Sequence, residues 1–190
     1  MGRRALLRIV FAALVAALAF AVAHAQSPGG GAATAVRESA VKAAFLYKFA
    51  SFVEWPAGTF TRPDQPIVIA VSGDEDVATD LGQLAAGRAI EGRPVVVRRV
   101  TEGATAAGAQ IVFFGERRDA RLHESIEAVP GAVLVVTSQV SGLRAGGVLN
   151  FQPDNGRVRF SVSLAAAEAR GLKLSSRLLS VAQNVEGRPR

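Results

Sequence analysis

The pattern of apolar and polar side chains between Val41 and Pro56 predicts an amphipathic helix. At about 100° per residue the apolar side chains gather on one arc, which consists of Val41, Phe45, Leu46, Phe49, Phe52 and Val53. The other side of the helix carries Tyr47, Lys48, Ser51 and Glu54. Pro56 lacks an amide hydrogen and restricts Trp55, so we expect the helix to end at about Glu54.

Two residues depart from this pattern. Lys42 falls on the apolar arc, where its aliphatic stem can lie along apolar surface while its ammonium group reaches water. Trp55 follows the expected end of the helix, and we expect it to stay partly exposed and to contact a partner. The phenylalanines of the helix we expect to pack on the protein's own sheet.

Between residues 67 and 136 the chain alternates short apolar runs with helical patterns. The apolar runs have the length and composition of buried strands, and they lie at 67–71, 94–100, 111–115 and 132–136. Helical periodicity appears between them, at 74–87 and 119–129. Strands that alternate with helices form βα units, which predict a mainly parallel sheet with helices on both of its faces.

After residue 145 the pattern changes to strict alternation of apolar and polar residues. It runs through 146–151 and 157–163, and the turn signal Asp154-Asn155-Gly156 lies between them. This predicts an antiparallel hairpin with one solvent-exposed face. The predicted fold is therefore α/β, with a mainly parallel sheet of about six strands, helices on both faces and a C-terminal antiparallel hairpin.

The last part of the chain predicts two short helices and a tail. A helix is expected at 165–170, and Ser175 or Ser176 caps a final amphipathic segment that contains Leu178, Leu179 and Val181. Residues 186–190 are expected to be a tail. We find no internal repeat, so residues 36–185 are predicted to form a single domain.

The first 25 residues have the pattern of a cleaved export signal. A basic start, Met1-Gly2-Arg3-Arg4, precedes an apolar run at 9–22 and the small-x-small site Ala23-His24-Ala25. The apolar run is short for a membrane span, although a retained N-terminal anchor is the alternative. We therefore predict cleavage after Ala25, a periplasmic location and a flexible leader at 26–35, which is rich in Gly and Ala.

Composition and charge exclude several classes of function. The chain has no cysteine, which rules out disulfides, a thiol nucleophile and a thiolate metal site. The formal net charge is +6, and removal of the signal would take away three arginines and no acid. The remaining domain is mildly basic, and export argues against nucleic acid as a partner. No metal or other cofactor is indicated, because His123 is the only histidine after the signal.

No catalytic motif is present, and one acidic cluster remains to be interpreted. The chain lacks the nucleophile elbow, the phosphate-binding loop and the dinucleotide-binding fingerprint. Asp74-Glu75-Asp76 follows the first parallel strand, where acids favour a helix N-terminus. The alternative is a ligand site at Ser72, Asp74 and Asp76, because open α/β sheets bind ligands at the carboxyl ends of their strands.

Two blocks of the sequence resemble the YfiR family of small periplasmic proteins. The first is VKAAFLYKFASFVEWP at 41–56, and the second comprises GGVLNF at 146–151 and RVRFSVSLAAAEARGLKLSSRLLSVAQNV at 157–185. Together they bracket the predicted domain. The chain departs from the family at 160–163, where FSVS lacks an acid and an amide, and in having no cysteine for the disulfides of the best-known relative.

The resemblance implies a regulator rather than an enzyme. It implies a repressor that binds the periplasmic sensor domain of an inner-membrane diguanylate cyclase, and that a peptidoglycan-associated outer-membrane lipoprotein can sequester. A homodimer is left open. We predict that the hairpin and the last helix form the contact surface, through Phe151, Arg159, Ser161, Leu174, Ser175 and Arg177, with Trp55 in support. Phe160 and Leu179 are assigned to the core.

The alternative function is a periplasmic small-ligand-sensing accessory of an uptake or two-component system. Its ligand would bind at the carboxyl ends of the parallel strands, at Ser72, Asp74 and Asp76, with Gly115 and Thr137-Ser138 nearby. A hydrolase is not favoured, because no pair of a nucleophile and a base can be named.

Overall fold

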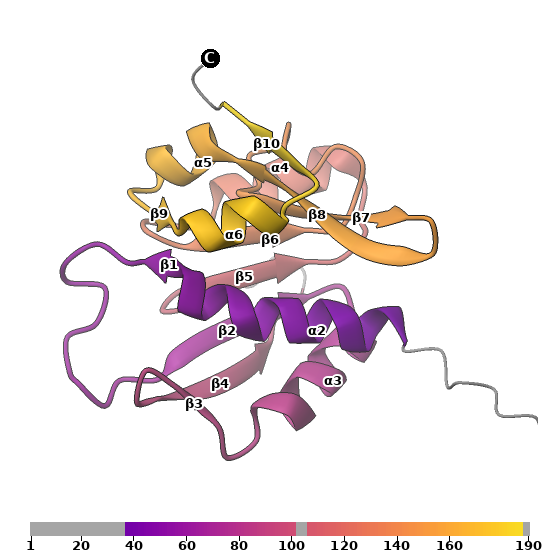
Figure 1. Ribbon diagram of the computed structural model, residues 1–190. Coiled ribbons are helices and arrows are strands. Elements are labelled where there is room, and N and C mark those ends of the chain that lie inside the picture. Colours follow the sequence, from indigo (N-terminus) through magenta and orange to yellow (C-terminus); the bar gives the residue numbers. More distant parts are fainter. Residues whose placement is uncertain (1–36, 102–105, 188–190) are drawn as a thin grey trace, which may run out of the picture. The chain divides into compact units, whose positions relative to one another are not determined.

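The computed structural model describes residues 37–101 and 106–187, which form one compact unit (Figure 1). The predicted signal at 1–25, its cleavage after Ala25 and the leader at 26–35 lie outside the described residues. Within the described residues, no helix combines the length and the apolar character that a membrane span requires.

The helices and strands follow the order that the hydrophobic pattern predicts. The helical segments are α2 (Glu38–Phe49), η1 (Ala50–Phe52), α3 (Glu75–Ala85), α4 (Asp119–Glu127), α5 (Leu164–Ala169) and α6 (Ser176–Val181). The longer strands are β2 (Ile67–Ser72), β4 (Arg93–Arg99), β5 (Ile111–Phe114), β6 (Leu134–Thr137), β7 (Leu149–Asp154) and β8 (Arg157–Ser163). The short strands are β1 (Val53–Glu54), β3 (Ala89–Ile90), β9 (Lys173–Leu174) and β10 (Asn184–Glu186).

The main sheet has eight strands in the order β10-β8-β7-β6-β5-β2-β4-β3, and β1 and β9 form a separate pair. Strands β4, β2, β5, β6 and β7 are parallel, whereas β7 and β8 form an antiparallel hairpin. The α/β class, the mainly parallel sheet and the hairpin are therefore confirmed. The sheet has two strands more than the six predicted, because the short strands β3 and β10 form its two edges.

Helices cover both faces of this sheet, as predicted. On β2, Ile67, Ile69 and Val71 belong to a core that also includes residues of α2, α3, α5 and α6. The alternate residues Val68 and Ala70 pack in a second core with residues of α4. Successive side chains of a strand point to opposite faces, so the apolar run of β2 supplies both cores.

Aromatic side chains join helix α2 to the hairpin. Phe45 and Phe49 pack against Phe151 and Phe160, with ring centroids 5.1–5.9 Å apart. Such offset and edge-to-face pairs stabilise a core beyond the apolar area that they bury. The two sequence blocks that carry the family resemblance thus pack directly on one another.

Helix α2 ends earlier than the sequence predicts. It ends at Phe49, a turn of 3₁₀ helix follows, and Val53–Glu54 is a strand instead of a continuation of the helix. The cause is backbone pairing with β9, in which Val53 lies opposite Leu174. The Phe52 carbonyl also accepts a hydrogen bond from the Ser175 amide at 2.9 Å. This pairing leaves no signal in the apolar periodicity, which continues to Val53.

Helix α2 is also buried over a wider arc than predicted. Tyr47, expected on the polar side, is 9 % exposed and donates a hydrogen bond to the Ala89 carbonyl at 3.3 Å. Arg37, just before the helix, pairs at 2.6 Å with the buried carboxylate of Asp80 in α3. The polar side of α2 therefore faces β3 and α3 in part, and only Lys48, Ser51 and Glu54 are exposed as expected.

The predicted tail, residues 186–190, includes the last residue of a strand. Glu186 belongs to β10, which pairs in parallel with β8 and places Glu186 opposite Ser163. Residues 188–190 lie outside the described residues.

Candidate functional site

Two residues predicted for the contact surface lie inside the domain. Phe151 is 2 % exposed and belongs to the aromatic cluster with Phe45 and Phe49. Ser161 is 4 % exposed, and its hydroxyl accepts a hydrogen bond from the Gln152 side-chain amide. The expectation of a solvent-exposed face is wrong at these two positions, because Phe151 packs in the core and the face of Ser161 is covered there; the same face is exposed nearer the turn, at Arg157 and Arg159. Neither side chain can contact a partner of the folded domain.

The other predicted contact residues divide into two groups. Trp55, Leu174, Ser175 and Arg177 come together where β1 pairs with β9 and α6 begins. Arg159 lies on the hairpin, where its nearest acid is Asp154 at 3.9 Å. In Figure 1 the hairpin turn and the β1–β9 pair lie at opposite ends of α2. A single contact surface therefore includes the first group and leaves Arg159 out.

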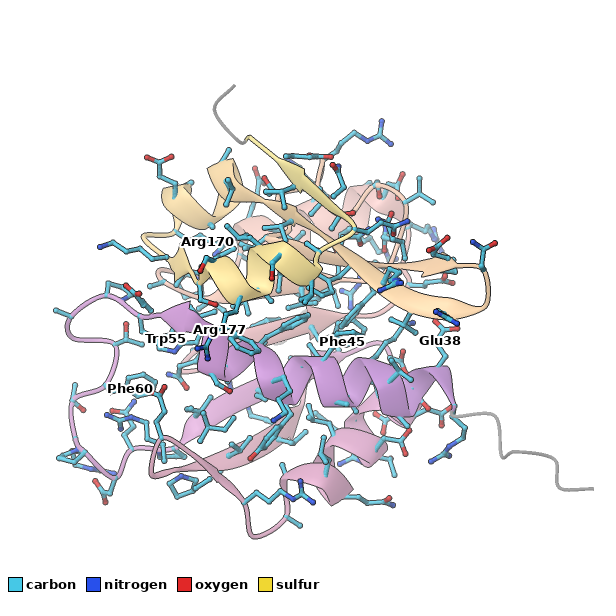
Figure 2. All side chains as sticks on the ribbon, in the orientation of Figure 1. Glu38, Phe45, Trp55, Phe60, Arg170 and Arg177 are labelled. Carbon is cyan, nitrogen blue, oxygen red and sulfur yellow. The ribbon has the colours of Figure 1, made fainter. Side chains whose placement is uncertain are left out.

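The surface at the β1–β9 pair combines apolar side chains with one arginine. Trp55 is half-buried and meets Phe60 edge to face at 6.3 Å, and Leu174 is half-buried beside it in β9. On α6, Arg177 is exposed, and Val181, one turn further, is 58 % exposed. We call Trp55, Leu174, Arg177 and Val181 the β1–β9 surface; Figure 2 labels Trp55 and Arg177 at this end of α2.

Ser175, from the predicted contact set, and Val181, from the last predicted helix, need comment. The Ser175 hydroxyl accepts from the Leu178 amide at 3.3 Å, so it caps α6 as expected. Val181 was predicted from helical periodicity to lie on the apolar side of the last segment. Leu178 is buried and Leu179 is half-buried, whereas Val181, the last residue of α6, is exposed.

The residues of the alternative ligand site have structural roles. Ser72 is 3 % exposed, and its hydroxyl and carbonyl accept from the Arg117 guanidinium at 3.0 and 3.2 Å. Asp74 accepts from the Val77 amide at 3.0 Å, which confirms the capping interpretation for α3. Asp76 is exposed in the first turn of that helix. Ligand binding by these three residues stays a prediction.

The chain segments that follow β2 and β5 approach each other closely. A Cβ atom on Gly115 would lie only 2.5 Å from the Gly73 carbonyl oxygen. Glycine at position 115 therefore permits a close contact between the two strand ends. This contact and Arg117 lie at the point where the strand order reverses, and the cavity beside them, lined in part by Ser72, Phe114 and Arg117, measures only about 170 Å³.

A polar cleft opens one strand further along the sheet. It measures about 570 Å³, and its walls come from the first turn of α2, the β5–α4 connection, the residues after β6, and β7 with β8. Strand β7 pairs with only Val136 and Thr137 of β6 and then runs past the end of that strand. The notch left beyond β6 is the cleft. Glu38 marks its α2 wall in Figure 2, at the end of the helix opposite Trp55.

The loop between β6 and β7 fixes the floor of the cleft. The Asn150 side-chain oxygen accepts from the Thr137 hydroxyl at 2.7 Å and from the Gln139 amide at 3.2 Å. A Cβ atom on Gly142 would overlap Thr137 Oγ1 and Asn150 Oδ1. The glycine-rich sequence at 142–147 is thus explained by close backbone packing against Asn150.

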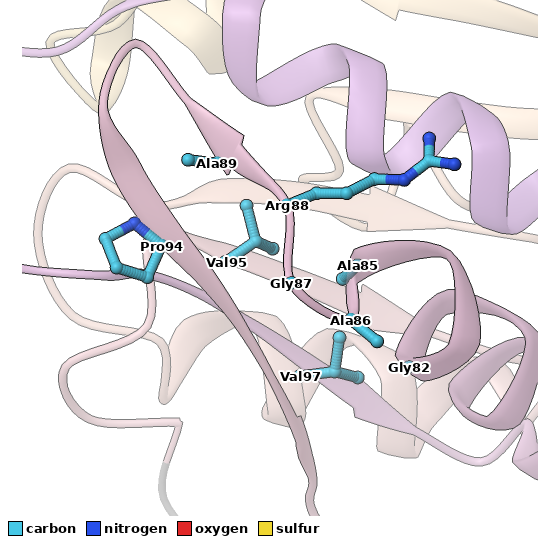
Figure 3. A pocket seen from close by; sticks show the side chains of 9 residues that line it. All are labelled: Gly82, Ala85, Ala86, Gly87, Arg88, Ala89, Pro94, Val95 and Val97. Carbon is cyan, nitrogen blue, oxygen red and sulfur yellow. The ribbon is translucent and has the colours of Figure 1, made fainter.

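A second depression is apolar. The groove beside β4 measures about 480 Å³ and is lined by Gly82, Ala85, Ala86, Gly87, Arg88, Ala89, Pro94, Val95 and Val97 (Figure 3). Only Arg88 among these is polar, and Figure 3 shows its side chain extending away from Pro94. This lining gives a small polar molecule little to bind.

Arg170 is a charged residue that serves the fold. Its guanidinium donates to the carbonyls of Ile126 at 3.1 Å and Val129 at 3.2 Å, near the C-terminal end of α4. Burial lowers the pKa of Arg170 below its ordinary value, because desolvation disfavours the charged form. Its hydrogen bonds tie α5 to α4 rather than presenting the charge to a partner.

The model of the YfiR/HmsC-like family matches residues 39–183, nearly all of the described domain. The chain belongs to this family. The resemblance noted in the two sequence blocks is thereby confirmed, and the matched range runs from the start of α2 to just before β10. None of the curated proteins matches the chain. The YfiR-like family is regulatory rather than catalytic, and it points to periplasmic control of a diguanylate cyclase.

Proposed function

We propose that this protein is a periplasmic regulator that represses an inner-membrane diguanylate cyclase by binding its periplasmic sensor domain. The observation that carries the proposal is membership of the YfiR/HmsC-like family over residues 39–183. The two blocks that resemble the family also meet in space at the β1–β9 pair. We assign partner binding to the β1–β9 surface for this reason.

The chemistry of that surface supports a protein partner. Protein interfaces are enriched in aromatic side chains and arginine, and their binding energy concentrates in a few such anchors. Trp55 and Arg177 provide those residue types, and Leu174 and Val181 add exposed apolar area. Backbone pairing between β1 and β9 holds the anchors in fixed relative positions, which reduces the entropy lost on binding.

Repression follows if the surface binds the inactive state of the sensor domain more tightly than the active state. The regulator then shifts the equilibrium by its difference in affinity, and about 100-fold preference corresponds to roughly 2.7 kcal/mol. The same resemblance suggests that a peptidoglycan-associated outer-membrane lipoprotein removes the regulator from the cyclase. Mass action by such a competitor is sufficient to reverse the repression.

A crosslinking experiment in cells tests the proposal. The tagged protein is crosslinked in vivo and purified, and its partners are identified by mass spectrometry. We expect one membrane protein that carries a diguanylate cyclase domain, and we expect deletion of the gene to raise cellular cyclic-di-GMP. Recovery of a histidine kinase or a transporter in its place would contradict the proposal.

A charge on the β1–β9 surface should release the cyclase. We expect Leu174→Asp and Val181→Asp to weaken binding about 10-fold or more, the loss typical of removing one interface anchor. Val181 is the cleaner position, because Leu174 also packs against the core. Val96→Asp is the matched control, since Val96 is 44 % exposed on β4, far along the sheet.

The readouts are retention of the cyclase by the purified variants and cyclic-di-GMP in cells. Circular dichroism and thermal melting confirm that each variant is folded. A folded Val181→Asp protein that still binds and represses the cyclase would show that the contact surface lies elsewhere.

A further inference from the structure

The polar cleft contains two side chains, Asn150 and Ser138, with polar atoms that have no partner among the described residues and are open to the cleft. Asn150 is 4 % exposed, and both hydrogen bonds of its side chain are accepted by Oδ1. Among the described residues, no acceptor binds its Nδ2 amide. Because a backbone amide donates to Oδ1, the orientation of the Asn150 amide is fixed and Nδ2 must face the cleft. The Nδ2 donor lies on a side chain that is otherwise buried and has no partner in the described protein, so it is available to a ligand in the cleft.

Ser138 supplies a second such group beside the first. It is 9 % exposed, lines the cleft, and makes no side-chain hydrogen bond to any residue that the structure describes. Its hydroxyl can both donate and accept. Together, Asn150 and Ser138 form a floor that offers at least two hydrogen-bond donors to a molecule in the cleft.

The cleft carries no excess of positive charge. The Lys42 side chain is 12 % exposed, and its ammonium pairs with Glu38 at 2.7 Å, so its charge is already neutralised. The guanidinium of Arg117 reaches away from the cleft to Ser72 and Ser125. Glu116 and Asp119 add carboxylates at the wall. This distribution gives no excess of positive charge to hold an anion.

The remaining wall is apolar. Pro153, Val158 and Val140 also line the cleft, and Val140 is 97 % exposed. Such a wall can pack against the C–H face of a ring while its hydroxyls reach the polar floor. The volume of about 570 Å³ lies within the range of roughly 300–1,000 Å³ that is usual for small-molecule sites.

We propose that the polar cleft binds a neutral, hydroxyl-rich small molecule of the size of a mono- or disaccharide. Hydroxyl groups both donate and accept, which matches donors at Asn150, Ser138 and Lys42 and acceptors at Glu116 and Asp119. The inference goes beyond the proposed function and does not depend on it, because it needs no protein partner. It also differs from the predicted site at Ser72, Asp74 and Asp76, none of which lines this cleft.

The site is tested by NMR titration of ¹⁵N-labelled protein, purified after export. The probes are D-glucose, N-acetyl-D-glucosamine and cellobiose, with D-glucuronate as the charged counterpart. We expect saturable shifts with at least one neutral sugar below about 20 mM, including the side-chain amide signals of Asn150. The acid should bind more weakly than the corresponding neutral sugar, because carboxylates line the wall.

Two variants test the floor of the cleft. Ser138→Ala removes a hydroxyl that makes no hydrogen bond within the described protein, so it should leave the fold unchanged and weaken binding roughly 5- to 10-fold. Asn150→Asp keeps the oxygen that Thr137 and Gln139 bind but replaces the free donor, and should weaken binding at least as much. The matched control is Ser180→Ala, an exposed serine on α6 outside the cleft.

The outcomes are decisive in either direction. Saturable binding of a neutral sugar that both variants weaken and Ser180→Ala does not would support the site. The inference is overturned if no probe binds, if only D-glucuronate binds, or if Ser138→Ala and Asn150→Asp, both folded, bind with wild-type affinity. Loss of the cyclase from the crosslinked complex has no bearing on this result, so the two proposals fail separately.

Discussion

The two ends of helix α2 differ in how completely their side chains are satisfied. At the Phe49 end, aromatic rings pack on the hairpin, and η1 leads into the β1–β9 pair. At the Glu38 end, the helix forms a wall of a cleft whose floor has unpaired hydrogen-bonding groups. Figure 2 shows both ends, with Trp55 on one side and Glu38 on the other.

This difference separates a surface suited to proteins from a site suited to a small molecule. Apolar anchors on a rigid backbone ladder bind by burying area, whereas unpaired donors in a cleft bind by completing hydrogen bonds. The helix between them has 12 residues, a length of about 18 Å at 1.5 Å per residue. The two proposed sites therefore lie at opposite ends of α2 and share no residue.

Phe49→Ala breaks the apolar end of α2 and has the largest expected effect. Phe49 is 1 % exposed and contacts three other aromatic rings, so its removal should lower the free energy of unfolding by about 3–5 kcal/mol. Urea unfolding followed by circular dichroism measures the loss. The half-buried Phe52 is the control, and Phe52→Ala should cost clearly less. Equal losses would show that the aromatic cluster does not dominate this end.

Gly142→Ala tests the packing beneath the polar cleft, at the Glu38 end of α2. Its Cβ would overlap Thr137 Oγ1 and Asn150 Oδ1, and we expect a loss of about 1–3 kcal/mol in the free energy of unfolding. Thermal melting and urea unfolding provide the measurement. Gly82→Ala is the matched control, because its added Cβ meets nothing within 4 Å in α3. It should instead stabilise the protein by up to about 1 kcal/mol. A well-tolerated Gly142→Ala would mean that the loop does not hold Asn150 in place.

Glu38→Gln has the smallest expected effect on stability, and it tests whether the charge at the Glu38 end of α2 reaches the cleft. Glu38 is 64 % exposed and Lys42 lies one turn away, so losing this ion pair should change stability by less than about 0.5 kcal/mol. The freed ammonium of Lys42 should, however, make the cleft more attractive to anions. We expect D-glucuronate to bind the variant more tightly than the wild type in the same titration. Unchanged affinity for the acid would show that the Lys42 charge does not reach the ligand.

The sequence predicted the framework of the fold because its elements have strong periodicity. The run Ile67–Ser72 and the alternation through Arg157–Ser163 each indicate a strand without any tertiary information. The two-residue strands β1 and β9 were missed, since so short a ladder has no period. Their pairing also overrides the helical preference of Val53–Glu54, which explains the wrong end predicted for α2.

The site was predicted less well, for a related reason. Phe151 and Ser161 were assigned to a contact surface because hairpins often have one exposed face, whereas this hairpin lies inside an eight-stranded sheet. Ser138 was named only as one of the strand ends near which the alternative ligand would bind, and Asn150 was not singled out, because serine and asparagine at the end of a strand are common turn residues. Only the assembled structure reveals that their hydrogen bonds are incomplete. The sequence contained one indication of the cleft, which was Lys42, a cation on the apolar arc of the first helix.

Helix α2 has a consequence for the order in which the chain folds. It begins the described domain, yet its aromatic face is covered by β7 and β8, which are among the last elements to be synthesised. Contacts between such distant segments form slowly, because a long loop must close before they contribute. Until the C-terminal block arrives, Phe45 and Phe49 remain uncovered and prone to aggregate. The emerging chain thus requires protection until synthesis is nearly complete.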